Sequence, residues 1–143
     1  MQYQAVVFDM DGVIFDTERL VIEFWKEVAK KHNIPNVEHT CIQCLGTNRV
    51  RTRAIFLENY GADFPFDPYR AEVTELFNTH YKGVPLPTKP GIRELLNYLQ
   101  EQDIKVGLAS STAQHLVRDE IGTAGLLPYF QTLVCGDMVE HSK

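Results

Sequence analysis

Near its start the chain reads Ala5-Val6-Val7-Phe8-Asp9-Met10-Asp11-Gly12. A short, uninterrupted apolar run such as residues 5–8 is typical of a strand that is buried on both faces of a sheet. Two later stretches repeat the order of an apolar run followed by small or acidic residues: 104–109, which ends at Ser110-Ser111-Thr112, and 132–135, which ends at Gly136-Asp137. The three stretches predict a parallel sheet whose strand ends carry polar side chains.

The segments between these runs show the apolar spacing of helices and the residues that commonly begin and end them. Thr47 is expected to cap the start of one helix. Asp67-Pro68 is expected to give another helix its N-cap and a proline at the first position. Helices are expected over about 17–32, 47–60, 67–82, 92–99 and 113–124, the first three with no strand between them.

This order of elements predicts an α/β protein, with a helical domain inserted after the first strand of a parallel sheet of about three strands. We expect the sheet domain to comprise residues 1–13 and 91–143. The helical insert, with its connectors, is expected to span residues 14–90. Three prolines in the stretch 84–90 favour a stiff connector at its end.

Composition excludes several classes of function. The 143-residue chain has 14 basic and 19 acidic residues, and its net charge of −5 does not indicate a nucleic-acid-binding surface. No apolar run reaches the roughly 18–20 residues that cross a bilayer, and the first residues lack the pattern of a secretory signal. Three cysteines are too few for a disulfide scaffold. We therefore expect a cytoplasmic protein with no nucleic-acid or membrane partner.

An acidic pair follows the first predicted strand. Asp9 and Asp11 are two residues apart, so their side chains point to one side of an extended backbone. They would lie beyond the carboxyl edge of the sheet, where open α/β sheets bind ligands. Two close carboxylates favour a bound cation or a proton on one of them, and a carboxylate can attack phosphorus. The pair therefore favours phosphoryl transfer.

Phosphate-binding groups are expected near this pair. Ser110, at the end of the second strand, can hold phosphate oxygens with its hydroxyl. The backbone N–H groups of Ser111 and the residues after it can do the same at the start of a helix. Lys143, preceded by Ser142, can supply a positive charge to the same oxygens.

Taken together, the motifs resemble those of the haloacid dehalogenase-like superfamily of phosphohydrolases: Asp9-Met10-Asp11-Gly12-Val13, Asp16-Thr17-Glu18, Leu108-Ala109-Ser110-Ser111-Thr112 and Ser142-Lys143. The position of the insert is similar to that in the β-phosphoglucomutase-like branch. The resemblance implies a Rossmann-like core with a helical cap domain. It implies that Asp9 is the nucleophile, that Asp11 is the general acid/base, and that Mg²⁺ is bound by the Asp9 side chain and the Asp11 backbone carbonyl. It also implies that Ser110, Ser111 and Lys143 bind phosphate.

The predicted cap domain contains Leu45-Gly46-Thr47-Asn48-Arg49, which resembles the substrate-specificity loop of this branch. The resemblance implies close approach of the substrate at Gly46 and pairing of Arg49 with an anionic or hydroxyl-rich substrate. The alternative is that Arg49 belongs only to a solvated helix face. Glu18, which follows Asp16-Thr17, resembles the phosphatase members, and residues 19–22 lack the His of the sugar mutase.

The function expected from these features is that of a Mg²⁺-dependent phosphatase. Its substrate would be a small phosphate monoester, a sugar phosphate or a related metabolite, and the reaction would pass through an aspartyl-phosphate. One alternative is a β-phosphoglucomutase-like sugar-phosphate mutase on the same scaffold. The other is a non-catalytic fragment, a phospho-receiver or a partner-binding module.

The resemblance to the superfamily stops at Lys143. The last acidic motif of the superfamily, which completes the Mg²⁺ site, would follow this residue. The core sheet would then be incomplete, because the remaining strands would pair beside the first strand. We expect the chain to be a fragment of a longer protein; the alternative is a truncated product that needs a partner. In either case the first strand would have an open, apolar edge, through which the chain can self-associate.

Overall fold

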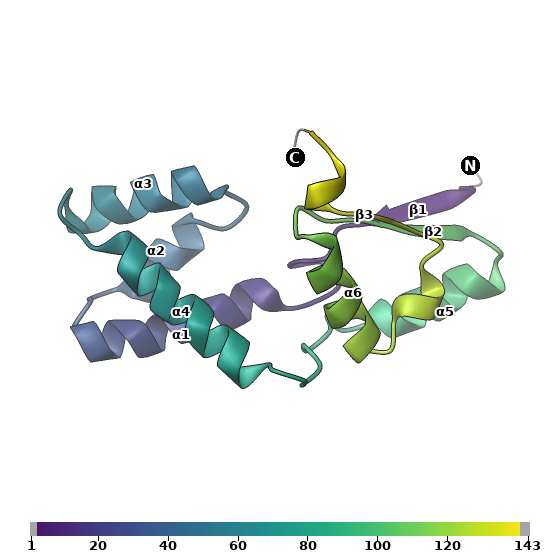
Figure 1. Ribbon diagram of the computed structural model, residues 1–143, viewed down its shortest axis with the longest axis horizontal. Helices are drawn as coiled ribbons and strands as arrows, with labels where there is room; N and C mark the ends of the chain where they lie inside the picture. The colour runs from purple at the N-terminus through teal and green to yellow at the C-terminus, as the bar shows by residue number, and fades with distance from the viewer. Residues whose placement is uncertain (1–2, 141–143) are drawn as a thin grey trace. The chain divides into compact units, whose positions relative to one another are not determined.

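The computed structural model describes residues 3–140 of the 143-residue chain. It divides into a sheet unit, formed by residues up to Thr17 and from Gly83 onward, and a helical unit, Glu18–Lys82. None of the helices in the described part of the chain combines the length and the apolar character needed to cross a membrane. In chain order the elements in Figure 1 are β1 (Ala5–Phe8), α1 (Thr17–His32), α2 (Val37–Gln43), α3 (Arg49–Tyr60), α4 (Phe66–His80), α5 (Ile92–Glu101), β2 (Lys105–Ala109), α6 (Gln114–Thr123), the 3₁₀ turn η1 (Leu127–Tyr129), β3 (Thr132–Val134) and the 3₁₀ turn η2 (Gly136–Met138).

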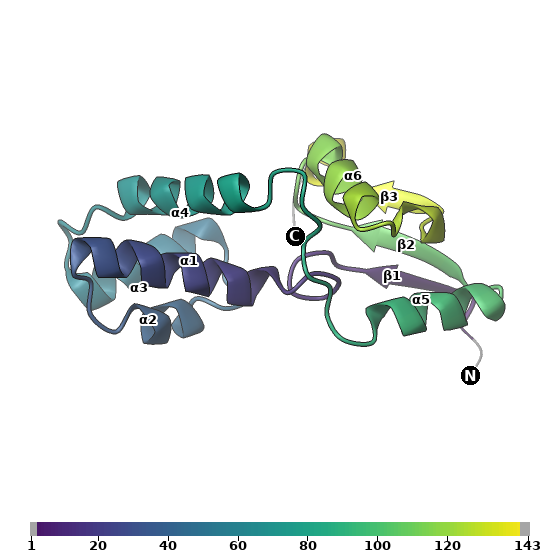
Figure 2. The same cartoon turned by 90° about the horizontal axis from the view of Figure 1, so that it is seen from below.

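The sheet unit contains three parallel strands in the order β1-β2-β3. Phe8 pairs with Leu108 in the first ladder, and Leu108 pairs with Leu133 in the second. Figures 1 and 2 show α5 and α6 on the same face of this sheet. Leu96 of α5 and Val117 of α6 are completely buried. The predicted α/β fold with a parallel sheet and an inserted set of helices is confirmed.

In the described part of the sheet unit, the opposite face of the sheet is open. Val7 of β1 is 68% exposed and Val134 of β3 is 41% exposed, although Phe8 is buried. Alternate residues of a strand face opposite sides, and α5 and α6, the described helices of the sheet unit, cover only one of these sides. The prediction that the first strand is buried on both faces is therefore wrong. Within the described residues β1 pairs only with β2, so it forms one edge of the sheet.

The helical unit has an apolar core of its own. Trp25 and Phe56 lie at its centre, with ring centroids 4.5 Å apart. Helices α1 and α4 are also joined at Glu72, whose carboxylate lies 2.8 Å from Lys31 Nζ and 2.9 Å from His32 Nε2. These two hydrogen bonds hold the pKa of Glu72 below its usual range. The buried residues of this core are Phe24, Trp25, Val28, Ala29, Val37, Cys41, Phe56, Phe66 and Val73.

Two helix starts in this unit differ from the predictions. Helix α2, Val37–Gln43, was not predicted, because seven residues are too few to show a helical pattern, and so four helices rather than three precede α5. Helix α4 begins at Phe66, a buried residue, so Asp67 lies within the first turn and is not an N-cap. Its carboxylate instead pairs with Arg53, at 3.1 Å from Nε.

The predicted N-cap of α3 is also wrong. Asn48, not Thr47, caps this helix, since Asn48 Oδ1 accepts a hydrogen bond from the backbone N–H of Arg51 at 2.9 Å. The Thr47 hydroxyl donates to the backbone carbonyl of Cys44 at 2.6 Å. Both residue types can cap helices, and the turn after α2 decides which of the two side chains reaches the free N–H groups.

Candidate active site

The turn after β1 is built around the backbone carbonyl of Met10. This oxygen accepts hydrogen bonds from the N–H groups of Val13, Ile14 and Phe15, at 3.3, 2.9 and 3.2 Å. Gly12 has a φ of 74°, a left-handed conformation that glycine adopts without steric cost. The side chains of Met10, Ile14 and Phe15 are fully buried, which anchors the turn in the sheet unit. The residues on either side of Met10, Asp9 and Asp11, are both exposed.

Each of the two aspartates is held by a hydrogen bond. Asp9 Oδ1 accepts from the backbone N–H of Met10 at 2.7 Å. Asp11 Oδ1 accepts from the hydroxyl of Thr17 at 3.1 Å, and the Thr17 oxygen in turn accepts from the N–H of Gly12 at 3.2 Å. Thr17 is 7% exposed, so it is itself fixed by packing. The motif Asp16-Thr17-Glu18 does not by itself predict the contact of Thr17 with Asp11.

The loop after β2 lies beside this turn. Ser110 is 5% exposed, and its hydroxyl oxygen accepts from the N–H of Thr112 at 3.2 Å, so its own proton can be donated elsewhere. The Thr112 hydroxyl lies 3.5 Å from Asp11 Oδ2, which links the two loops. Ser111 is exposed, and α6 begins soon afterwards at Gln114. The contact of Thr112 with Asp11 is a second one that the sequence pattern did not reveal.

The parallel register explains why these groups meet. Since Phe8 is paired with Leu108, the residues after both strands leave the sheet at the same edge. Asp9, Asp11 and Ser110 therefore lie at adjacent strand ends, as the sequence predicted for a parallel sheet. Lys143, the third predicted phosphate-binding residue, lies outside the described residues, as does Ser142.

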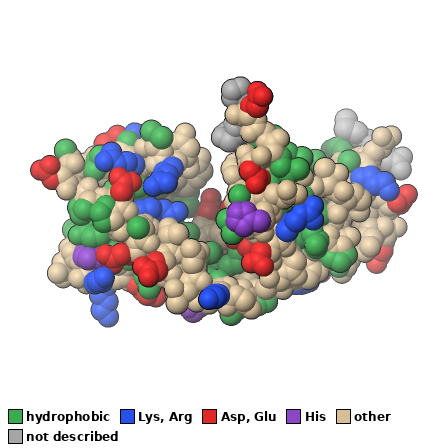
Figure 3. Space-filling view, viewed as in Figure 1, with side chains coloured by type: hydrophobic (Ala, Val, Ile, Leu, Met, Phe, Trp, Pro, Cys, Tyr) green, Lys and Arg blue, Asp and Glu red, His purple; other side chains and the backbone are tan. Residues whose placement is uncertain are grey.

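The other predicted substrate residues belong to the helical unit. Glu18 is exposed in the first turn of α1. Gly46 has a φ of 73°, and a Cβ placed there would meet no atom within 4 Å. Arg49 begins α3, and its guanidinium lies 3.7 Å from Asp67 Oδ1. Figure 3 shows basic side chains gathered over α3. On the same helix, Arg51 pairs with Glu58 at 2.8 Å.

Glu120 is an additional acidic residue of the sheet unit that the sequence analysis did not single out. It is half-buried on α6, between the fully buried residues Val117 and Ile121. Burial raises its pKa to about 7, and the charges of Asp11 and Asp119 contribute to the rise. Glu120 comes three residues after Val117 and one residue before Ile121. This spacing from two core positions is the only feature of the sequence that indicates its placement.

A magnesium site would need oxygen ligands. The described residues contain no group of three or more His, Cys, Asp or Glu side chains that could hold a metal ion. Mg²⁺, however, commonly binds through one or two carboxylates together with waters and substrate phosphate. The Asp9 carboxylate and the Asp11 carbonyl are hard oxygen donors at the end of one strand, so their chemistry fits this ion.

Comparison with known protein families shows which family the chain belongs to. The model of the haloacid dehalogenase-like hydrolase family matches residues 6–143. The chain belongs to this family. Among haloacid dehalogenase-like relatives, the phosphorylated carbohydrates phosphatase of Thermotoga maritima is 31% identical over 140 residues, covering 98% of this chain and 64% of that protein. The β-phosphoglucomutase of Bacillus subtilis is 35% identical over 117 residues, covering 76% of this chain and 51% of that protein.

Solved structures agree with this membership of the haloacid dehalogenase-like family. A crystal structure of a Thermotoga maritima protein matches with a TM-score of 0.71 and 31% identity, covering 98% of this chain and 64% of that one. The chain therefore spans about half to two thirds of the length of these relatives. The predicted resemblance to the superfamily and to its β-phosphoglucomutase-like proteins is confirmed. One curated relative is a phosphatase and the other a mutase, so the family alone does not decide between the two reactions.

Proposed function

We propose that this protein is a Mg²⁺-dependent phosphatase that hydrolyses a small phosphate monoester, a sugar phosphate or a related metabolite, through an aspartyl-phosphate. The supporting observation is the placement of Asp9 and Asp11 beside Ser110, at the carboxyl ends of β1 and β2. The relatives named as sugar-phosphate phosphatases, including that of Thermotoga maritima, support the substrate class.

In the first step a carboxylate oxygen of Asp9 attacks phosphorus, and the bond from phosphorus to the leaving oxygen breaks. Asp11 gives its proton to that oxygen, so the product leaves as a neutral alcohol. In the second step Asp11 takes a proton from water, the water oxygen attacks phosphorus, and the Asp9 carboxylate is regenerated as phosphate leaves. Mg²⁺, held by the Asp9 carboxylate and the Asp11 carbonyl, would offset the negative charge that accumulates on the phosphoryl oxygens.

The remaining groups position the reactants. The hydroxyl of Ser110 and the N–H of Ser111 can donate to the phosphoryl oxygens, as donors do wherever charge develops during phosphoryl transfer. The N–H groups of Thr112 and Gln114 already donate to Ser110 Oγ and to Asp137. The hydroxyl of Thr17 holds one oxygen of Asp11 at 3.1 Å, which limits the rotation of this carboxyl group. Lys143 is proposed to add a positive charge to the same phosphate.

A sugar-phosphate mutase is the second candidate. The 35% identity to the Bacillus subtilis β-phosphoglucomutase favours it. Against it, residues 19–22 are Arg19-Leu20-Val21-Ile22, without the His expected of the sugar mutase. A mutase would isomerise its substrate when primed by a bisphosphate and would release little inorganic phosphate.

A screen for phosphate release tests the proposal. The protein is incubated with phosphorylated sugars, polyols and nucleotides, in separate reactions that contain either Mg²⁺ or a chelator. We expect Mg²⁺-dependent release from at least one small phosphate monoester. Isomerisation without release would favour the mutase. A long-lived phosphoaspartate formed from a phosphodonor protein, without turnover of any metabolite, would favour a phospho-receiver and contradict the proposal.

Arg49 is proposed to contact the part of the substrate that leaves. Its loss should lower kcat/KM for a sugar phosphate by roughly 10-fold or more, as expected for a hydrogen bond to a charged group. The effect on p-nitrophenyl phosphate, which lacks hydroxyl groups, should be much smaller. Arg51→Ala is the matched control, because Arg51 lies on the same helix and is paired with Glu58. Equal losses on both substrates in Arg49→Ala would contradict the role.

Self-association through β1 is proposed for the 143-residue chain. The evidence is the edge position of β1 in the described sheet and the 68% exposure of Val7. Exposed apolar edge strands recruit other chains, and lysines oppose this pairing. Sedimentation velocity should detect dimers that Val7→Lys abolishes and that Val50→Lys, a control at an exposed position of α3, leaves intact. A chain that is monomeric at all concentrations would refute this proposal.

A further inference from the structure

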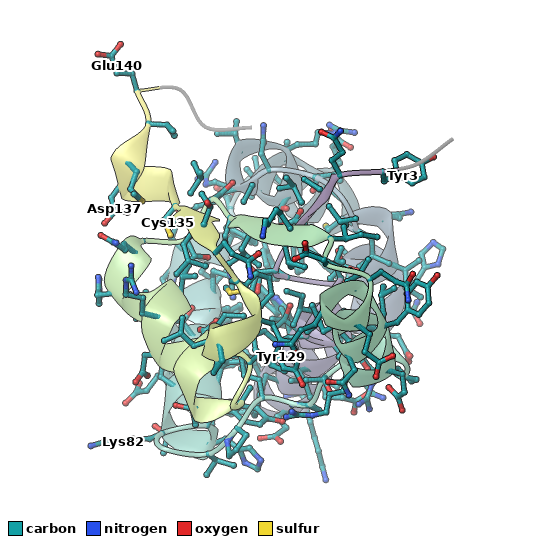
Figure 4. All side chains as sticks on the ribbon, turned by 90° about the vertical axis from the view of Figure 1, so that its right-hand side faces the viewer. Tyr3, Lys82, Tyr129, Cys135, Asp137 and Glu140 are labelled. Atoms are coloured by element: carbon teal, nitrogen blue, oxygen red, sulfur yellow. The ribbon has the colours of Figure 1, made fainter. Side chains whose placement is uncertain are left out.

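The turn after β3 is attached to the loop after β2 at several points. Ser110 donates its backbone N–H to the carbonyl of Val134 at 2.9 Å, and Gly136 donates its N–H to the carbonyl of Thr112 at 2.9 Å. Asp137 Oδ1 accepts from the backbone N–H of Gln114 at 2.9 Å. In Figure 4, Asp137 lies in the turn beside the first turn of α6. The loop 110–114 is thus held along most of its length by residues 134–137.

Gly136 approaches this loop more closely than any other residue type could. A Cβ at this position would lie 2.7 Å from the carbonyl carbon of Ser111, and nearer still to its oxygen. The obstacle is backbone, so a side-chain rotation cannot relieve it. The φ of Gly136 is not in the left-handed region, so the requirement for glycine arises from space and not from conformation.

Asp137 supplies the cap that α6 lacks locally. The N-cap residue of this helix is Ala113, whose side chain has no hydrogen-bond acceptor. The first N–H groups of a helix need partners from outside, and a carboxylate there also interacts favourably with the helix dipole. Asp137, 23 residues later in the chain, provides that partner to Gln114.

We propose that Gly136 and Asp137 are positioning residues for phosphate binding. They hold the loop 110–114 so that the Ser110 hydroxyl and the Ser111 N–H are available to the phosphate in advance, while the Thr112 N–H stays on Ser110 Oγ and the Thr112 hydroxyl keeps its contact with Asp11. This inference rests on the proposed function, in which that loop binds the phosphoryl group. Neither residue touches the substrate, so each acts through Ser110–Thr112.

The first test compares alanine at two glycines. Gly136→Ala must displace Ser111, whereas Gly122→Ala adds a Cβ that meets no atom within 4 Å. Competitive inhibition of the encoded protein by inorganic phosphate reports on the loop. We expect Gly136→Ala to raise the inhibition constant at least roughly 10-fold, as a misplaced binding group would, and Gly122→Ala to leave it unchanged.

The second test keeps the inference falsifiable if Gly136→Ala does not fold. Asp137→Ala removes the acceptor for Gln114, and Asp137→Asn retains an acceptor oxygen without the charge. We expect Asp137→Ala to speed hydrogen exchange at the Gln114 amide and to raise the inhibition constant of phosphate by roughly five-fold. Asp137→Asn should restore both values to within about two-fold. If Asp137 only stabilised the fold, Asp137→Ala would leave the inhibition constant of phosphate unchanged.

The controls separate this inference from the proposed function. If inorganic phosphate does not bind the unaltered protein, or if Ser110→Ala leaves its binding unchanged, the phosphate site itself is wrong and both proposals fail. If Ser110→Ala weakens phosphate binding but Gly136→Ala and Asp137→Ala do not, only the positioning role is overturned.

Discussion

Replacing Asp9 with asparagine is expected to abolish phosphate release, with a loss of roughly 10³-fold or more, because the amide cannot act as the nucleophile. The substitution is nearly isosteric. The asparagine oxygen can still accept the hydrogen bond from the Met10 N–H that the aspartate accepts at 2.7 Å. The turn after β1 should therefore persist, and the loss should appear in kcat rather than in the melting temperature.

The matched control for this variant is Asp63→Asn, at an exposed aspartate of the helical unit. Both variants lose one negative charge, but only the first loses the proposed nucleophile. Steady-state phosphate release and circular dichroism are measured on both. An Asp9→Asn protein that keeps a tenth or more of the turnover would remove Asp9 from the reaction.

Asp11→Asn should slow turnover by roughly 10²–10⁴-fold, the usual contribution of a general acid or base. The asparagine oxygen can still accept from the Thr17 hydroxyl, which lies 3.1 Å from Asp11 Oδ1, and the backbone carbonyl proposed to bind Mg²⁺ is unchanged. The variant should therefore keep its fold and its affinity for the ion. Its phospho-enzyme should persist, because no base activates the attacking water.

The leaving group distinguishes the two roles proposed for Asp11. An alkoxide needs a proton to leave, whereas p-nitrophenolate does not. In rapid-mixing experiments the Asp11→Asn variant should release p-nitrophenol in a burst and then turn over slowly, and with a sugar phosphate it should show no burst. Equal rates of the first step for both substrates, in the variant as in the unaltered protein, would contradict the acid role.

Much of the fold follows from local patterns. The apolar runs before Asp9 and Ser110 predicted parallel strands, and parallel strands bring these two residues to one edge whatever connects them. Whether the face of β1 that carries Val7 is buried could not be predicted in the same way. Val7 is apolar, but whether it is covered depends on which elements pack against the sheet, and α5 and α6 pack on the other side.

Capping and loop contacts escaped prediction for a related reason. Thr47 and Asn48 are both acceptable N-caps, Asn being the better of the two, and the path of the chain after α2 places Asn48 at the helix start. The hydrogen bond of Thr17 to Asp11 and the close approach of Gly136 to Ser111 depend on where two loops meet. Such contacts between segments distant in the sequence leave no periodic signal. The catalytic roles of the site residues stay predictions until the variants are measured.

The most direct test of the central claim is to trap the covalent intermediate. The protein is mixed with substrate and Mg²⁺, quenched with borohydride, digested and analysed by mass spectrometry. An acyl phosphate at Asp9 would be reduced to the alcohol, so the peptide containing residue 9 should carry homoserine at that position, and only when substrate was present. Rapid substrate turnover with Asp9 unmodified and the reduced residue elsewhere, or absent, would contradict the account.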